Sequence, residues 1–150
     1  MELHDQILIK APRELVYAAL NDPAVLKECI PGCEELVKHS DTELEARLLL
    51  KIGPVKARFT GKVTLNPENP PERFSLTGEG SGGAAGFAKG GAEVELEDHG
   101  AETLLRYTAK AEIGGKLAQL GSRLIQGTAK KLAASFFAAF ADHVGSSEKV

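Results

Sequence analysis

The sequence offers few residues whose types could do chemistry, and the most conspicuous are two cysteines. Cys29 and Cys33 frame an Ile-Pro-Gly turn, which would bring two thiols close together. Structural zinc needs four ligands, and the sequence holds neither a second cysteine pair nor histidines at a ligand spacing. A redox pair is one interpretation, and two packing residues beside a turn is the simpler one. The sequence therefore predicts no metal site.

A glycine-rich run beginning at Gly78 also has a spacing associated with chemistry. Residues 78–83 match the G-x-G-x-x-G pattern of dinucleotide sites. That chemistry requires a strand before the glycines and a helix after them, whose N-terminus binds the pyrophosphate. Strand-like sequence follows here instead, so the pattern does not indicate a nucleotide site. As far as Gly91, the run is either a flexible hairpin at the rim of a cavity or an irregular hairpin with bulges.

An enzyme working inside the fold would need polar groups that converge, and three residues are candidates. Asp5 falls on the inward side of the first predicted strand, where a carboxylate near a cavity could act as a general base. Tyr107 contributes one hydroxyl from the last predicted strand, and His4 is adjacent to Asp5 in the sequence. Nothing else in the sequence pairs with them, so we predict no catalytic residues.

Composition narrows the class of protein. The chain has 150 residues, 43% hydrophobic and 26% charged, which predicts one globular domain. Its net charge is −3 and its lysines and arginines are scattered, unlike the basic patch of a nucleic-acid-binding protein. Glu2, His4 and Asp5 follow Met1, where a signal peptide would have a basic and then an apolar run. Together with two cysteines, this predicts a cytoplasmic protein.

The elements that must position these residues follow from the periodicity. Alternation over residues 3–9 predicts a strand, Pro12 opens a short helix over 13–20, and Asp22 caps a second short helix that ends before Pro31. From Glu34 onward apolar and polar residues alternate, which predicts an antiparallel sheet with one apolar face. This part holds about six strands, the clearest covering residues 43–52, 55–65, 73–79, 92–97 and 102–113.

The segment Lys116–His143 predicts one long amphipathic helix. Its apolar residues recur mostly at helical spacing: Leu117, Leu120, Leu124, Leu132, Phe136 and Phe140. This helix must cover the apolar face of a strongly curved sheet, because no other element is large enough to do so. We therefore predict an α+β helix-grip fold, in which a curved antiparallel sheet of about seven strands wraps round the long C-terminal helix and two short helices follow the first strand. Residues 1–144 would form this single domain and residues 145–150 a flexible tail.

The sheet points small side chains at that helix. They are Ala46, Ala57, Gly61, Gly78, Ala92, Ala109 and Ala111. Such residues can let a helix approach closely or mark bends, or they can leave a cavity for an apolar ligand. Because aromatic residues make up only 5% of the chain, we favour the cavity. Strand parity and helical phase predict its lining as Ile30, Leu48, Leu50, Phe59, Phe87, Tyr107, Leu117, Leu120 and Leu124.

Several separate motifs resemble those of one known family. They lie at residues 21–23, 29–34, 51–55, 59–61, 78–91 and 114–121. Together, over residues 1 to about 143, they resemble the carbon monoxide dehydrogenase CoxG family of the START-related, birch-pollen-allergen-like (SRPBCC) superfamily. The resemblance implies the helix-grip fold of a START domain and a hydrophobic cavity beneath the long helix. It offers no catalytic residues to transfer.

The resemblance also implies a role. Members of this family are encoded with molybdenum hydroxylases such as aerobic carbon monoxide dehydrogenase, and bringing the enzyme to the membrane or carrying a quinone to it are the roles implied. These roles imply no intrinsic cofactor, a bound quinone or lipid, a molybdenum hydroxylase as partner and transient contact with the inner face of the cell membrane. We expect a binding and carrier protein, not an enzyme. The alternatives are a recruitment or maturation factor with an incidental cavity, and a cyclase or hydrolase that works in the cavity.

Overall fold

The computed structural model describes residues 1–148, and in that part of the chain seven strands form one antiparallel sheet. The elements in chain order are β1 (Glu2–Ile9), α1 (Arg13–Leu20), α2 (Pro23–Cys29), β2 (Cys33–Lys38), β3 (Glu43–Ile52), β4 (Val55–Asn69), β5 (Arg73–Ser81), the 3₁₀ helix η1 (Gly83–Ala85), β6 (Phe87–His99), β7 (Glu102–Gly114), the 3₁₀ helix η2 (Gly115–Leu120) and α3 (Ser122–Glu148). The strand order is β1-β7-β6-β5-β4-β3-β2. The predicted α+β class and strand number are confirmed.

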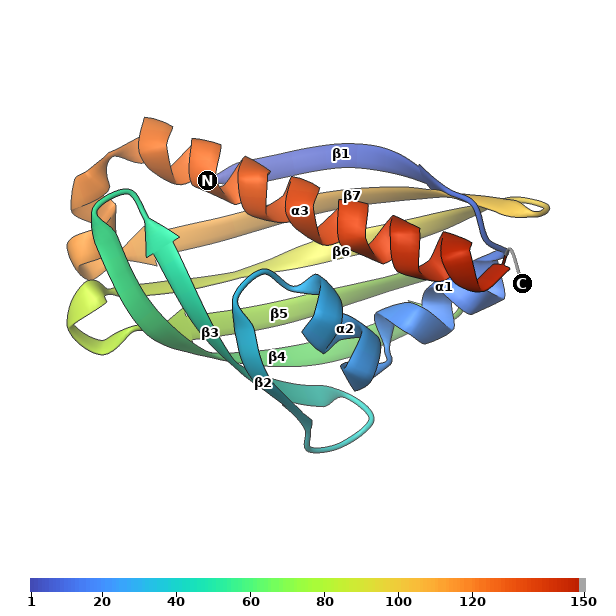
Figure 1. The fold of residues 1–150 in the computed structure, drawn as a ribbon, viewed down its shortest axis with the longest axis horizontal. Helices are drawn as coiled ribbons and strands as arrows, with labels where there is room; N and C mark the ends of the chain where they lie inside the picture. The colour runs from blue at the N-terminus through green and yellow to red at the C-terminus, as the bar shows by residue number, and fades with distance from the viewer. Residues whose placement is uncertain (149–150) are drawn as a thin grey trace.

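The sheet curls round α3, which lies across its concave face (Figure 1). The helix packs against β1 along one side and against α2 and α1 along the other. The helices α1 and α2 connect β1 to β2, the two edge strands. The concave face of the sheet therefore faces α3 and the convex face is turned away from it, which confirms the predicted helix-grip arrangement.

Local sequence explains the second short helix directly. Asp22 is the N-cap of α2, and its Oδ1 accepts a hydrogen bond of 2.9 Å from the backbone N–H of Ala24. Pro23 occupies the first helical position, where its missing N–H costs nothing and its fixed φ suits the helix. The predicted cap and start of α2 are therefore confirmed.

The long helix begins later than the sequence predicted. Gly115 has φ +71° and Gly121 has φ +91°, conformations that interrupt an α-helix at both positions. Between them the chain forms η2, so α3 begins at Ser122 instead of Lys116. At its other end α3 continues to Glu148, into the segment expected to be a tail, and residues 149 and 150 lie outside the described residues. No helix within residues 1–148 combines the length and hydropathy that a membrane span requires.

Buried side chains form three clusters. The first joins α1, α2 and the C-terminal half of α3 to β1, β5, β6 and β7. Its fully buried members are Ile9, Ala11, Val16, Leu96, Leu105 and Phe140. The second, which we call the end cluster, lies beneath η1 and η2 and consists of Ile52, Val55, Phe59, Ala85 and Leu117. The third lies under α2 and consists of Leu26, Leu44 and Leu65. These clusters fix the ends and one side of the sheet against the helices.

Candidate ligand-binding site

The centre of the concave face carries small side chains instead of buried large ones. One row across four strands reads Ala46, Gly61, Gly80 and Ala88. All four residues are half-buried, and none belongs to the buried part of a core cluster. A closed interior would need larger side chains to reach normal packing density. The centre of this face therefore retains accessible surface between the three clusters.

An open groove of about 730 Å³ lies between α3 and β1 on this side of the sheet. Its β1 and β7 wall includes Leu3, Asp5, Ile7 and Tyr107. Its α3 wall consists of Gln126, Lys130, Ala133, Ala134, Phe137, Ala138 and Ala141. Spacings of three and four residues place this second set on one face of the helix. Because four of the seven are alanines, the helix is narrow there and leaves space; we call this hollow the α3–β1 groove.

Tyr107 is the polar group best placed to contact a ligand in the groove. Its ring stacks on Phe137 with centroids 5.1 Å apart and planes 20° apart. Its hydroxyl makes no hydrogen bond to any residue in the described part of the chain. Burial, and to a smaller extent the negative charge of Asp5, raise the pKa of the Tyr107 phenol. The phenol therefore stays protonated at neutral pH and can donate a hydrogen bond to a carbonyl oxygen.

Other polar groups stand along the rim of the groove. Asp5 is the direct cross-strand neighbour of Tyr107, and its Oδ1 accepts a hydrogen bond of 2.8 Å from the Gln6 backbone N–H. Gln126 Nε2 donates to the backbone oxygen of Glu2 at 2.9 Å, which ties α3 to the first residues of β1. Lys130 is exposed at the same rim. The groove thus has an alanine and aromatic floor with charged groups at its edge.

This groove differs from the enclosed cavity that the sequence predicted. Tyr107 is the one residue of the nine predicted lining residues that lines the groove. Two of the others, Phe59 and Leu117, belong to the end cluster, and Leu50 and Leu120 pack against it. Ile30 packs against the third cluster. Leu48 is half-buried and directly opposite Phe59 in the β3–β4 ladder. These six residues face the helix side of the sheet, but they pack at its end and beside α2.

Phe87 and Leu124 depart furthest from the prediction. Phe87 is 45% exposed, and the ladder register places it on the convex face with Ser81 and Gly114. Leu124 is 38% exposed and lies over Gly53 in the β3–β4 turn, because η2 shifts the start of α3. Neither placement fits a lining of the concave face, so the predicted positions of both residues are corrected.

Phe137 and the alanines of α3 are the groove residues that sequence reasoning missed. The prediction rested on the leucines and phenylalanines of the helix, which lie on the face that packs against the core. A second stripe, from Gln126 through Lys130 and Phe137 to Ala141, has the same helical spacing. That stripe could have indicated a second, less crowded face of the helix.

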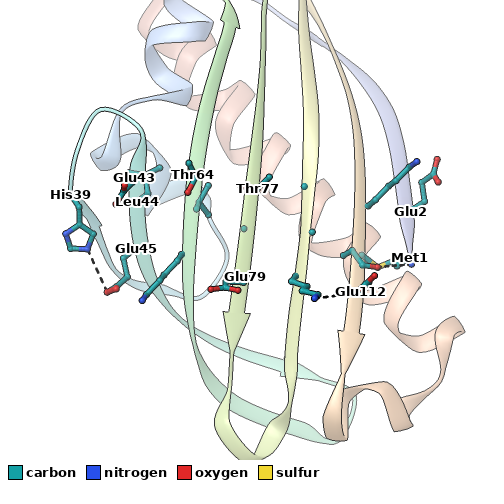
Figure 2. Close-up of a pocket in the computed structure, with 18 residues that line it drawn as sticks. Met1, Glu2, His39, Glu43, Leu44, Glu45, Thr64, Thr77, Glu79 and Glu112 are labelled. Carbon is teal, nitrogen blue, oxygen red and sulfur yellow. Dashed lines mark hydrogen bonds and ion pairs between the residues drawn. The ribbon is translucent and has the colours of Figure 1, made fainter.

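A larger hollow, of about 1170 Å³, lies on the convex face (Figure 2). A row of alternating charges crosses five strands there in the order Glu45, Lys62, Glu79, Lys89 and Glu112. Lys89 Nζ lies 3.7 Å from Glu112 Oε2, and His39 Nε2 lies 3.9 Å from Glu45 Oε2. Opposite charges on neighbouring strands favour each other. This lining stabilises the sheet surface and does not suit an apolar ligand.

The two cysteines have the properties of packing residues. Cys29 is buried in the first core cluster, and Cys33 Sγ contacts the backbone oxygen of Glu35 at 3.5 Å. Burial is the main cause that raises the pKa of both thiols, so less thiolate is present at neutral pH. Within residues 1–148, no three histidine, cysteine or acidic side chains gather as a metal site would require.

The glycine-rich hairpin is more regular than the flexible hairpin or the bulged hairpin that the sequence suggested. β5 and β6 pair without interruption from Arg73 opposite Glu95 to Ser81 opposite Phe87. The loop between them contains η1, in which Ala85 is buried in the end cluster. Most glycines of the run therefore belong to paired strands and contribute to the small-residue surface of the sheet.

Comparison with known proteins agrees with this architecture. The family model for CoxG, a subunit of carbon monoxide dehydrogenase, matches residues 6–145. A conserved protein from Geobacillus kaustophilus is 31% identical, with a TM-score of 0.91 and coverage of 98% of this chain and 97% of that one. Among curated proteins no match was found.

More distant solved structures share the fold. A START superfamily protein from Mycobacterium smegmatis is 12% identical, with a TM-score of 0.72 and coverage of 95% of this chain and 96% of that one. The Zhui aromatase/cyclase from Streptomyces sp. R1128 is 12% identical, with a TM-score of 0.71 and coverage of 96% and 93%. Since the family model covers nearly the whole chain, the protein belongs to the carbon monoxide dehydrogenase CoxG family.

Proposed function

We propose that this chain binds and carries a hydrophobic small molecule with a polar head, most simply a quinone or another lipid. The binding site is the α3–β1 groove together with the adjoining small-residue surface of the concave face. The observation that carries the proposal is the Tyr107 hydroxyl, which stands in an alanine-lined groove without a hydrogen-bond partner among the described residues. A quinone carbonyl would accept its hydrogen bond, and the quinone ring would lie near the Tyr107–Phe137 stack.

The expected affinity suits a carrier. Burying about 300 Å² of apolar surface yields roughly 7.5 kcal/mol at about 25 cal/mol per Å². The loss of translational and rotational freedom offsets several kcal/mol of that gain. Even without that offset, about −7.5 kcal/mol corresponds to a dissociation constant of roughly 3 μM, so binding is micromolar at its tightest, which permits both loading and release. An open groove is consistent with the same exchange, because no buried wall has to unfold before the ligand leaves.

The family supports an accessory role beside a dehydrogenase. The matching family takes its name from a component of carbon monoxide dehydrogenase, and we infer that a molybdenum hydroxylase of this kind is the partner that receives the carried molecule. We further infer that the chain itself is not an enzyme, although the aromatase/cyclase shows that this fold can support catalysis. In the groove Tyr107 and Asp5 are neighbours, but Asp5 is exposed and its Oδ1 already accepts a hydrogen bond from the Gln6 backbone N–H.

The test is a binding titration with a short-chain quinone, decyl-ubiquinone, on protein freed of lipid. Ala138→Trp places a bulky ring in the groove from an exposed position on α3. Its matched control is Ser135→Trp, which adds the same ring at an exposed position of α3 outside the groove. Loss of the apolar contact area should weaken binding at least about tenfold in Ala138→Trp and leave Ser135→Trp near wild type. Equal affinity in all three proteins would contradict the site, and no binding by wild type would favour a recruitment factor with an incidental hollow.

A further inference from the structure

We propose that one end of the molecule docks on an anionic bilayer surface. This end, which we call the cationic end, consists of residues 51–56, 83–87 and 115–124. It comprises the β3–β4 turn, η1 with the start of β6, and η2 with the start of α3. The proposal deepens the proposed function, since a carrier of a lipid-soluble molecule must meet a membrane, and it names the surface and the lipid chemistry involved.

The three segments of the cationic end are held together as one surface. The backbone of Gly86 lies so close to η2 that a Cβ there would meet Gly114 O at 2.5 Å and Leu117 N at 3.1 Å. Leu124 packs over Gly53, which joins the start of α3 to the β3–β4 turn. Figure 1 shows these segments at the end of the molecule opposite the C-terminus. The end cluster beneath them makes this surface a fixed part of the fold.

Charge is distributed very unevenly between this region and the rest of the chain. Residues 51–56, 83–87 and 115–124 contain four lysines and arginines and none of the 21 acidic residues of the chain. Arg58 and Lys89 form ion pairs with acidic residues of neighbouring strands. The cations of the cationic end that form no ion pair within residues 1–148 are Lys51, Lys56, Lys116 and Arg123. All four are exposed.

Some of these cations lie where the fold itself disfavours them. Lys51 and Lys56 are directly opposite each other across the β3–β4 hairpin, and like charges in such a pair repel. Arg123 lies in the first turn of α3, where the helix dipole favours an anion. Their positions therefore lower the stability of the isolated protein, and an external anionic surface would relieve both effects.

Apolar residues lie among the cations. Phe87 and Leu124 are exposed, and the turns carry exposed Pro54, Ala84 and Ala118. Cations attract a surface to anionic lipid, while exposed apolar side chains enter the interfacial layer. Neither type of residue alone indicates a membrane, but together, without a carboxylate in the same segments, they fit an anionic bilayer.

The opposite end supplies an internal comparison. Leu8 and Leu15 are also exposed there, at 50% and 49%. The hollow at that end is lined by three arginines and several carboxylates. The arginines are Arg13, Arg73 and Arg106, and the acidic residues are Glu68, Glu72, Glu95, Glu97 and Asp98. Acidic groups outnumber the cations in it, so an anionic membrane would not favour this end. Exposed apolar residues therefore occur at both ends, whereas an exclusively cationic surface occurs at one.

The test is co-sedimentation of the full chain with phosphatidylcholine vesicles that contain about one third phosphatidylglycerol. We expect binding that falls at high salt and is weak on pure phosphatidylcholine. Lys51→Glu/Lys56→Glu should lower the partition coefficient at least about tenfold, because each cation near such a surface strengthens binding severalfold. Its control, Lys10→Glu/Lys27→Glu, makes the same charge change at exposed sites elsewhere and should change binding less than about twofold. Phe87→Ser should weaken binding more than Leu8→Ser.

The proposal is overturned if wild type does not bind the anionic vesicles, binds neutral vesicles equally well, or loses the same affinity in both charge variants. Capture of an acidic protein by this end in the absence of vesicle binding would also overturn it. Titration of Lys51→Glu/Lys56→Glu with decyl-ubiquinone in vesicle-free buffer separates the two proposals. Unchanged quinone affinity with lost vesicle binding supports docking by the cationic end, whereas a protein that binds vesicles but no quinone would remove only the carrier function.

Discussion

Tyr107 combines apolar contact and hydrogen bonding in one side chain. Its ring packs on Phe137, and its hydroxyl is available to a ligand in the α3–β1 groove. Burial and the Asp5 charge both favour the neutral phenol. The raised pKa means that the folded protein holds this proton more firmly than the unfolded chain does. The associated stabilisation is present at neutral pH and is lost as pH rises through the raised pKa.

Tyr107→Phe should weaken quinone binding without disturbing the groove, because phenylalanine keeps the ring stack and removes only the donor. A hydrogen bond is worth about 0.5–1.5 kcal/mol net, so affinity should fall roughly two- to twelvefold. Wild-type affinity should be constant between about pH 6 and about pH 9, since the phenol pKa lies above its ordinary value of about 10. Isothermal titration of both proteins across this range checks the expectation. A wild-type affinity that titrates near neutrality, or a variant equal to wild type, would show that the phenol is not the donor.

Gly121 precedes the first residue of α3 and Gly127 lies inside that helix, and the two glycines differ in backbone conformation. Gly121 has φ +91° and ψ 148°, a conformation that is essentially restricted to glycine, and no atom lies within 4 Å of a Cβ built there. Gly127 lies inside α3, is exposed and has equally open surroundings. Backbone conformation, not space, therefore distinguishes the two positions.

Gly121→Ala and Gly127→Ala should change stability in opposite directions. At Gly121 the alanine must adopt a strained conformation, which should lower the free energy of unfolding by about 1–3 kcal/mol. At Gly127 an alanine is the better helix former and should raise that free energy by about 0.5–1 kcal/mol. Urea denaturation followed by circular dichroism measures both. If Gly121→Ala were as stable as wild type, α3 would not require the break that separates it from η2.

Local signals in the sequence were sufficient for elements whose ends are fixed by nearby residues. Pro12 and the Asp22 cap define α1 and α2, and the alternation of apolar residues defines the strands. The start of α3 was missed because the leucines at its beginning have a spacing that fits one continuous helix as well as a 3₁₀ turn followed by a helix. Gly121 is the residue that interrupts the helix. Phe87 was misplaced because the register of β6 depends on where the preceding loop ends.

The site was harder to predict than the fold because it depends on how separate elements meet. The small residues on the concave face were recognised from strand parity, and they do keep accessible surface. Which side of α3 opens depends on the curl of the sheet and on the tilt of the helix, and both come from packing between distant segments. For this reason the groove lies beside β1, whereas Leu50, Leu117 and Leu120 of the predicted lining lie in or against the end cluster.

The molecule has three kinds of surface. The convex face carries paired charges, the cationic end carries cations with exposed apolar residues, and the α3–β1 groove lies between the long helix and the edge strand β1. The groove and the cationic end share α3. The first turn of this helix lies in the cationic end, and its alanines line the groove. A lipid-like molecule could thus reach the groove while the cationic end is on a bilayer.

The most direct measurement is a crystal structure of the protein in complex with decyl-ubiquinone. The account predicts density for the quinone between α3 and β1, with one carbonyl oxygen within hydrogen-bond distance of the Tyr107 hydroxyl and the tail over the alanines of α3. Quinone density in the convex hollow or within the end cluster, with the groove empty, would contradict it.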